Sequence, residues 1–221
     1  MSVSMPVVRA RWRDIGWIAD LVTDALHPTA FGAWLVPDEQ RRPYVLAAVA
    51  RIWIEHALLF GDAFLLQDGS AATVWFHRYR PIPPPARYVD RLADVCGEHR
   101  DRFDLLDRAL AARRPTEAHI HLALLAAPGQ TLARRADILA GTQRRIDTLG
   151  LPTYAEVFTE ADRDLLRGHG YAQRDAFPMP SGTIAHPMWR ISPFSTDRRV
   201  GNAGRPAALA RNGRVNGWAP R

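Results

Sequence analysis

The chain has 221 residues, of which 47% are hydrophobic and 24% are charged, and its formal net charge is +6 at pH 7. These values are ordinary for one soluble domain with a good core, and we expect neither a bilayer-spanning apolar run nor a signal peptide. The single cysteine, Cys96, excludes an internal disulfide, so we expect a cytoplasmic protein.

The first sixty residues predict one short strand and two helices. Val7 to Arg11 is a candidate edge strand, and apolar residues at helical spacing predict a helix from Ile15 to Leu26, which His27-Pro28 ends. A second helix is predicted from Asp38 to Leu59. Between the helices, Thr29 to Pro37 predicts a loop with exposed aromatic residues.

The next segment predicts a hairpin and then helical material. Two β-like runs, Asp62 to Gln67 and Ala71 to His77, flank an Asp68-Gly69 turn. The proline-rich segment after them does not suit regular structure, because proline lacks a backbone donor. Tyr88 to Arg114 has a helical pattern that is interrupted near Cys96-Gly97.

The stretch from His119 to Tyr171 predicts strand, turn, helix, strand and helix. The strands are His119 to Ala126 and Tyr154 to Phe158, and the helices are Gln130 to Leu149 and Thr159 to Arg167. Two strands joined through a helix favour a parallel pair with a right-handed crossover. The helix N-terminus after the first strand suits an anion such as phosphate, because its N–H groups are free and its dipole is positive there.

The C-terminal part predicts two more strands, 172–177 and 186–191, and then a tail. The chain contains no lysine, and residues 192–221 hold six arginines and one aspartate, which is a net charge of +5 out of +6. The body is therefore nearly neutral and shows no basic stripe typical of a nucleic-acid platform. We expect a domain at 1–191, a basic flexible tail at 192–221, and neither nucleic acid nor membrane as a partner.

Three pieces of the central stretch carry a family pattern. They are Leu124–Pro128, Gln130–Arg135 and Gly150–Glu156, and the last continues without a gap to Gly170-Tyr171. The chain resembles the GNAT superfamily of acetyl-CoA-dependent N-acetyltransferases, and most of all the branch that contains puromycin N-acetyltransferase. The resemblance implies an α/β (α+β) fold with a mixed, mostly antiparallel central sheet and helices on both faces.

The resemblance also implies acetyl-CoA, or another acyl-CoA, as the cofactor. The residues that it places at this cofactor are Leu125, Ala126, Ala127, Gln130, Leu132, Ala133, Arg134, Arg135, Ala136 and Asp162. Backbone amides at the end of the central strand would polarise the thioester carbonyl. Arg134 and Arg135 either contact phosphates or are solvated arginines on a helix surface.

Four positions depart from the family pattern. Ala133 stands where the signature Q/R-x-x-G-x-G/A has its first glycine, and Arg135 stands where it has a second small residue near the pyrophosphate. Asp162 replaces an asparagine that contacts the cofactor, and Leu166 replaces the tyrosine that commonly protonates the leaving thiolate. These departures support an alternative in which the protein has lost turnover.

The candidate catalytic residues are His119, His121 and Glu156. The two histidines alternate on one face of the central strand, where either could take a proton from an amine near neutral pH, or be structural. Glu156 lies in the middle of the next strand and is either a base or a structural hydrogen-bonding group. No histidine or cysteine spacing suggests a metal site.

The predicted function is transfer of an acetyl or related acyl group from acyl-CoA to the amine of a small molecule. Phe31 and Trp34, in the predicted loop, are candidates for the acceptor site. The alternative is a non-catalytic GNAT-like binding or structural protein. A homodimer is the expected protein partner, if any.

Overall fold

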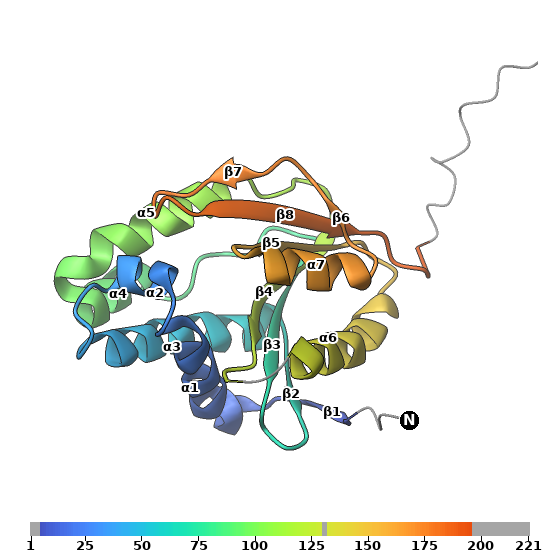
Figure 1. Ribbon diagram of the computed structural model, residues 1–221, viewed down its shortest axis with the longest axis horizontal. Coiled ribbons are helices and arrows are strands. Elements are labelled where there is room, and N and C mark those ends of the chain that lie inside the picture. The colour runs from blue at the N-terminus through green and yellow to red at the C-terminus, as the bar shows by residue number, and fades with distance from the viewer. Residues whose placement is uncertain (1–4, 130–131, 196–221) are drawn as a thin grey trace, which may run out of the picture.

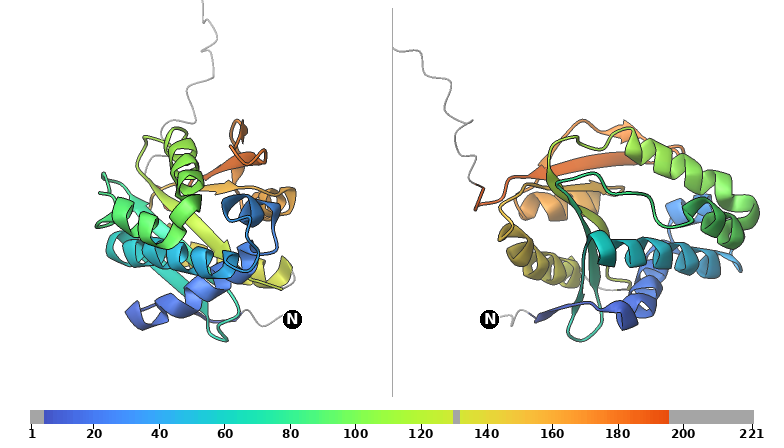
Figure 2. Two further views of the ribbon diagram at one scale, coloured as in Figure 1. Left: turned by 90° about the vertical axis from the view of Figure 1, so that its left-hand side faces the viewer. Right: turned by 180° about the vertical axis from the view of Figure 1, so that it is seen from behind.

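The computed structural model describes residues 5–129 and 132–195, and its centre is an eight-stranded sheet with helices on both faces (Figures 1 and 2). The strands are β1 Val7–Arg9, β2 Gly61–Leu66, β3 Ala72–Arg78, β4 His119–Ala126, β5 Thr153–Val157, β6 Ala172–Gln173, β7 Phe177–Pro178 and β8 Ile184–Arg190. They lie in the order β1-β2-β3-β4-β5-β8-β6, and β7 pairs with β8. Among the described strands only β4 and β5 pair in parallel, which confirms the predicted mixed, mostly antiparallel sheet.

Helices cover the two faces of this sheet in separate groups. The helices are α1 Ile15–Leu26, α2 Ala30–Leu35, α3 Arg42–Phe60, α4 Tyr88–Cys96, α5 Arg100–Ala111, α6 Leu132–Asp147 and α7 Glu160–Gly168. Helices α6 and α7 pack on one face around Trp75, Ile120 and Leu122. Helices α1 and α3 pack on the other face, and α2, α4 and α5 extend that layer toward β7 and β8.

The parallel pair at the centre separates soon after it forms. β4 and β5 are in register only from Ile120 to Leu122 and from Thr153 to Ala155, although both strands continue. The pairing of β3 with β4 also shifts, because Val74 lies opposite Leu124 and Trp75 opposite Leu122, so Ala123 is an extra residue. A bulge of this kind bends its strand. The fold therefore opens between the ends of β4 and β5.

The predicted loop from Thr29 to Pro37 is wrong in its centre, where α2 forms. Thr29 caps this helix, since its Oγ1 accepts a hydrogen bond of 2.9 Å from the backbone N–H of Gly32. The segment is too short to form a helix alone and is held by packing of Phe31 and Leu35 into the core. Phe31 is accordingly buried rather than exposed.

Gly32 allows α2 to pack against the end of α1. A Cβ on Gly32 would lie 2.2 Å from the backbone carbonyl oxygen of Leu26, whereas a Cβ on Gly168 would meet no atom within 4 Å. We expect Gly32→Ala to lower the free energy of unfolding by about 1–3 kcal/mol, because overpacking moves backbone. The control Gly168→Ala should leave stability unchanged or raise it by about 0.4–1 kcal/mol. Urea unfolding checks both values, and equal midpoints for the two variants would contradict this packing.

Helix α3 differs from two expectations. It begins at Arg42, because the Asp38 side chain accepts bonds from the N–H groups of Gln40 and Arg41 and forms a turn. Its 19 residues, with a mean hydropathy of 1.3 in the most apolar window, also meet the length and composition of a membrane span, although the sequence predicts no bilayer-spanning run. In the structure α3 packs against α1, α4 and β2 and supplies Val49 and Ala50 to the core.

The C-terminal strands are shorter or begin earlier than predicted. The strand expected at 172–177 is split into β6 and β7, and β8 begins at Ile184. Just after β8, Ser192 is buried, and its Oγ donates a bond of 3.1 Å to the carbonyl oxygen of Asp147. The predicted tail lies outside the described residues from 196 onward.

Candidate functional site

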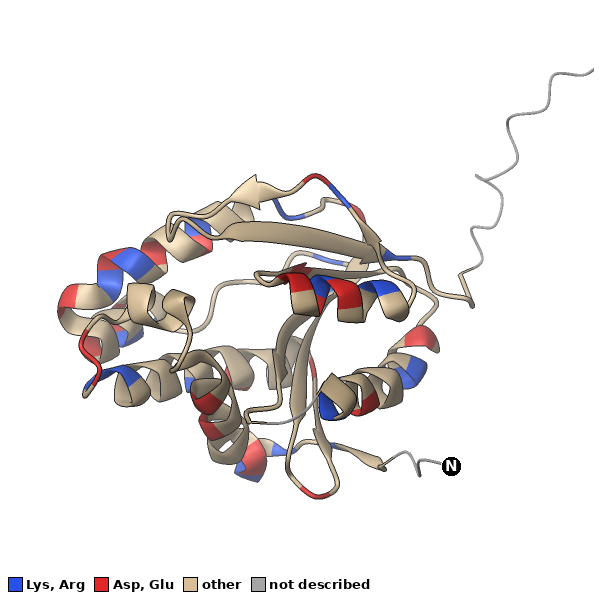
Figure 3. Ribbon diagram, viewed as in Figure 1, with Lys and Arg blue, Asp and Glu red and all other residues tan. Residues whose placement is uncertain are grey.

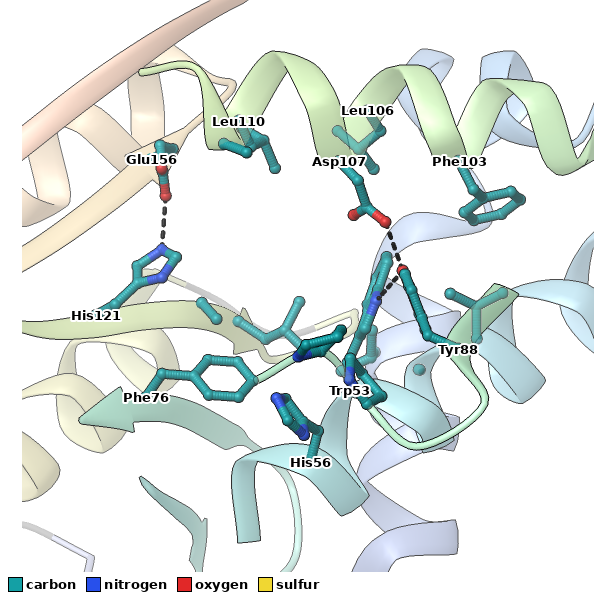
Figure 4. A pocket seen from close by; sticks show the side chains of 18 of the residues that line it. Trp53, His56, Phe76, Tyr88, Phe103, Leu106, Asp107, Leu110, His121 and Glu156 are labelled. Atoms are coloured by element: carbon teal, nitrogen blue, oxygen red, sulfur yellow. Dashed lines mark hydrogen bonds and ion pairs between the residues drawn. The ribbon is translucent and has the colours of Figure 1, made fainter. Parts of the chain in front are cut away.

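A cavity of about 450 Å³ lies on the face of the sheet that α1 and α3 cover. Residues of α1–α5, of β3, β4 and β5, and of the proline-rich segment before α4 line it (Figure 4). Its walls are mainly apolar, and a few polar groups converge on it, which is typical of small-molecule sites. The apolar wall includes Leu26, Phe31, Leu46, Phe76, Phe103 and Leu124.

His121 and Glu156 form a buried pair at one end of the cavity. His121 Nε2 lies 2.6 Å from Glu156 Oε2, and both side chains are less than one tenth exposed. The parallel register places His121 beside Tyr154, so Glu156, two residues further along β5, points to the same face. Arg78 Nε lies 3.4 Å from His121 Nδ1 and can donate to it. Of the three catalytic candidates, the structure thus brings these two together.

The charge of this pair is set by two opposing effects. Burial raises the pKa of the Glu156 carboxyl. The electrostatic attraction of His121 and its hydrogen bond act in the opposite direction and outweigh burial, so the pKa is lowered overall. Glu156 is therefore a carboxylate at neutral pH. Its other oxygen, Oε1, is buried and makes no well-formed hydrogen bond among the described residues, although the nearby Tyr154 hydroxyl also helps to lower the pKa of the carboxyl. The pair accordingly offers acceptor atoms at the cavity.

His119 lies apart from this cavity. Its ring is 1% exposed, its Nδ1 lies 2.6 Å from the carbonyl oxygen of Glu117, and it packs against the rings of Tyr154 and Trp189. Burial lowers the pKa of His119 and keeps the ring neutral. This environment favours the structural interpretation of His119.

A second group of hydrogen-bonded side chains lies across the cavity from the His121–Glu156 pair. Trp53 Nε1 donates to the Tyr88 hydroxyl over 3.1 Å, and that hydroxyl donates to Asp107 Oδ2 over 2.6 Å (Figure 4). Burial raises the pKa of Asp107, and burial together with the Asp107 charge raises the pKa of Tyr88. Sequence reasoning missed this group. The available signal was a carboxylate on the apolar helix face that carries Phe103 and Leu110.

The two acceptor-site candidates differ in their relation to the cavity. Phe31 lines it and stacks on Phe158, with ring centroids 4.9 Å apart. Trp34 lies behind Phe31 at 6.1 Å and is not among the residues that line the described cavity. Phe31 thus forms a wall, and Trp34 supports it.

The cofactor candidates gather where β4 ends and α6 begins. Leu125 and Ala127 pack toward α6, and Ala126 packs toward α1 and α3. Gln130 lies outside the described residues. In the first turns of α6, Leu132 and Ala133 are exposed, and Arg134, Arg135 and Ala136 are half-buried. Just before them, Pro128 and Gly129 line a second, more open hollow beside the end of α1.

Two of the departures from the family pattern contact each other. Arg135, in the first turn of α6, forms an ion pair with Asp162, in the first turn of α7. Figure 3 shows this basic start of α6 and acidic start of α7. The neighbouring Arg134 lies 3.3 Å from Asp68. Because α6 and α7 follow β4 and β5, the Arg135–Asp162 pair links the two helices at the opening between these strands.

Leu166 belongs to the core. Its side chain is fully buried with Ile138, Leu139 and Tyr171 under the sheet. A leucine side chain cannot donate a proton, so Leu166 contributes to packing and not to proton transfer. In the described ranges, 5–129 and 132–195, no group of three or more metal-ligating side chains is present.

Comparisons with known proteins identify the fold. No family model matches the chain, and no curated protein matches it at a significant level. A histone acetyltransferase and related acetyltransferase from Corynebacterium glutamicum is 19% identical, with a TM-score of 0.65 over 88% of this chain and 99% of that one. Arylalkylamine N-acetyltransferase 2 from Aedes aegypti is 8% identical, with a TM-score of 0.59 over 86% and 99%. An N-acetyltransferase from Staphylococcus aureus Mu50 is 12% identical, with a TM-score of 0.51 over 83% and 98%.

These likenesses confirm the predicted GNAT acetyltransferase fold. At such identities they show the fold alone, because one fold can host several functions. The puromycin N-acetyltransferase-like branch, the acceptor and the site residues stay predictions.

Proposed function

We propose that the protein is an N-acyltransferase that moves an acetyl or related acyl group from acyl-CoA to the amine of a small molecule. The observation that carries this proposal is the His121–Glu156 pair, which lies at the end of an apolar cavity on two strands that separate beside it. In a fold shared with acetyltransferases, this is where an acceptor amine and a thioester would meet. The resemblance to the puromycin N-acetyltransferase-like branch is in keeping with a small acceptor.

The pair supplies the base that this reaction needs. An acceptor amine attacks only when neutral, so its proton must go to a nearby group. Glu156 Oε1 is the open acceptor atom, because His121 Nδ1 already accepts from Arg78 and Nε2 bonds to Glu156 Oε2, and we assign the proton to the pair as a unit. The amine nitrogen would then bond to the acyl carbon as the carbon–sulfur bond breaks, and the leaving sulfur would take back one proton from the His121–Glu156 pair. Acyl-CoA, when bound, supplies the activated thioester.

The start of α6 supplies groups for the phosphates of acyl-CoA. A helix N-terminus favours negative charge, and α6 is 16 residues long. Arg134 and Arg135 add two guanidinium groups, which are now paired with Asp68 and Asp162. Phosphates would compete with these carboxylates for the same donors. Cofactor binding therefore involves an exchange of ion-pair partners.

Calorimetric titration with acetyl-CoA tests the proposal. We expect binding in the micromolar range, and a dissociation constant about tenfold higher in Arg135→Ala, because one charge-assisted contact is lost. Arg144→Ala, near the other end of α6, is the matched control and should bind like the unaltered protein. Absence of binding at millimolar acetyl-CoA would contradict the proposal. A cavity that binds amines without acetyl-CoA would then favour the non-catalytic alternative.

Replacing Asp162 by asparagine tests how the ion pair acts. We expect Asp162→Asn to bind acetyl-CoA about five- to tenfold more tightly, because it removes a negative charge near a polyanion and releases Arg135. The control Asp164→Asn changes an exposed carboxylate on the same helix and should leave affinity unchanged. Calorimetry at low and high salt measures both. Weaker binding by Asp162→Asn would show instead that Asp162 orders Arg135 for the phosphates.

A further inference from the structure

Two arginines line the cavity without an acidic partner of their own. They are Arg78, the last residue of β3, and Arg114, just after α5. Neither makes an ion pair with a carboxylate of the described residues. The one side-chain hydrogen bond of Arg78 there is the long contact from Nε to His121, and the buried Nε of Arg114 has no acceptor.

Two other largely buried arginines, Arg42 and Arg190, have several polar partners. Arg42 donates to the backbone carbonyl oxygens of His27, Val36 and Pro37, and Arg190 donates to both carboxylate oxygens of Asp147. Burial of a guanidinium without such partners costs free energy. Arg100, outside the cavity lining, also has a buried Nε without a hydrogen bond, but it forms an ion pair with Asp104, whereas Arg78 and Arg114 form none among the described residues.

The two charges also affect each other. Burial and the nearby Arg114 charge lower the pKa of Arg78 to about 10, although the Glu156 charge acts in the opposite direction, so the closeness of the two cations destabilises their charged forms. An anion between them would relieve both effects. Glu156 and Asp107 attract these cations through space, but neither carboxylate forms an ion pair with Arg78 or Arg114 among the described residues, and each bonds to His121 or Tyr88 instead.

The position of Arg78 beside His121 limits the distance between an anionic group bound to Arg78 and an amine at the His121–Glu156 pair. Arg78 contacts His121 over 3.4 Å, and His121 contacts Glu156 over 2.6 Å. A ligand that puts its amine at the His121–Glu156 pair and an anionic group on Arg78 must carry the two groups only a few atoms apart. The rest of such a ligand would occupy the apolar part of the cavity.

We propose that the acceptor is an apolar amino acid, or a similar small amine with a carboxylate beside it, whose carboxylate binds Arg78 and Arg114. This inference rests on the proposed acyl transfer for the role of the amine. A planar carboxylate matches the fork of guanidinium donors. The unpaired arginines are the feature that distinguishes this acceptor from a simple arylalkylamine, which has no anionic group.

Matched pairs of ligands with and without the carboxylate test the inference. We would titrate L-phenylalanine against 2-phenylethylamine, and L-tryptophan against tryptamine, and then measure acetyl transfer to each. We expect the amino acid of each pair to bind roughly 10- to 100-fold more tightly than the amine. Arg78→Gln and Arg114→Gln should remove this preference by raising KM for the amino acids. Because Arg78 contacts His121, only Arg114→Gln is expected to leave KM for the amines little changed.

The neighbouring Arg113 provides the control. Its guanidinium lies over the ring of Phe177, outside the cavity lining, so Arg113→Gln should keep the preference. Equal or tighter binding of the amines, or no binding of any amino acid at millimolar concentration, would overturn the inference. Because ligand binding is measured without acetyl-CoA, this result is separate from acyl transfer. Acetyl transfer to the amines but not to the amino acids would contradict the amino-acid acceptor and would still support the proposed acyl transfer.

Discussion

Replacement of Glu156 by glutamine is expected to lower kcat for acyl transfer by about 10²- to 10⁴-fold, the usual contribution of a positioned base. The change keeps the shape of the side chain but removes the carboxylate that holds His121 Nε2 at 2.6 Å. In this variant no carboxylate remains beside His121 to accept the proton of the acceptor amine. His121→Asn should lose a similar factor, and the double variant should lose little more, because the two residues act as a unit.

Steady-state kinetics with a substrate amine and acetyl-CoA measure this effect. The control Glu117→Gln alters an exposed carboxylate on the approach to β4, where its side chain is 59% exposed, and should leave kcat unchanged. Unaltered binding of acetyl-CoA by calorimetry would show that Glu156→Gln is folded. An active Glu156→Gln with ordinary kcat would contradict the assignment of the base.

The second large effect concerns stability. Asp147, the last residue of α6, pairs with Arg190, the last residue of β8, through contacts of 2.5 and 3.0 Å. Their side chains are only 7% and 15% exposed, so Asp147→Ala would leave a buried guanidinium without its carboxylate. We expect a loss of about 3–5 kcal/mol in the free energy of unfolding, which is typical when one member of a buried pair is removed.

Denaturant unfolding checks this expectation against an exposed pair. Asp164 contacts Arg163 and Arg167 on the outer surface of α7, where solvent screens the charges, so Asp164→Ala should have no measurable effect. The double variant Asp147→Ala, Arg190→Met should recover part of the loss, because it removes the uncompensated charge. No difference between Asp147→Ala and Asp164→Ala would contradict a structural role for the buried pair.

The central strands and part of the site could be predicted because their signals are local. The apolar run at His119–Ala126 and the Asp68-Gly69 turn specify strands through neighbouring residues alone, and they lie where predicted. The pairing of His121 with Glu156 follows from the parallel register of β4 and β5. The sequence predicted that these strands are parallel but not which residues lie opposite each other. Helix α2 was missed because tertiary packing of Phe31 and Leu35 stabilises it.

The rest of the cavity could not be predicted because it depends on how α3, β3, α4 and α5 pack together. Trp53, Tyr88 and Asp107 come from three helices and share no motif. Arg78 and Arg114 are two among 29 basic residues, and nothing in the sequence distinguishes them. Their lack of an acidic partner is visible only in three dimensions.

The departures Arg135 and Asp162 illustrate the same limit. Each alone weakens the family resemblance, and only the structure shows that the two side chains form an ion pair. Because Arg135 and Asp162 carry opposite charges, the two departures together leave the net charge at the opening between β4 and β5 unchanged. This contact is compatible with cofactor binding if the phosphates can compete for Arg135.

The most direct test of the central claim is to incubate the protein with acetyl-CoA and an apolar amine or amino acid and to quantify the acetylated product and free CoA together. Acyl transfer predicts that the two appear in equal amounts, at a rate that Glu156→Gln reduces by about 10²-fold or more. Release of CoA without acetylated product, or equal rates for both proteins, would contradict a transferase that works through the His121–Glu156 pair.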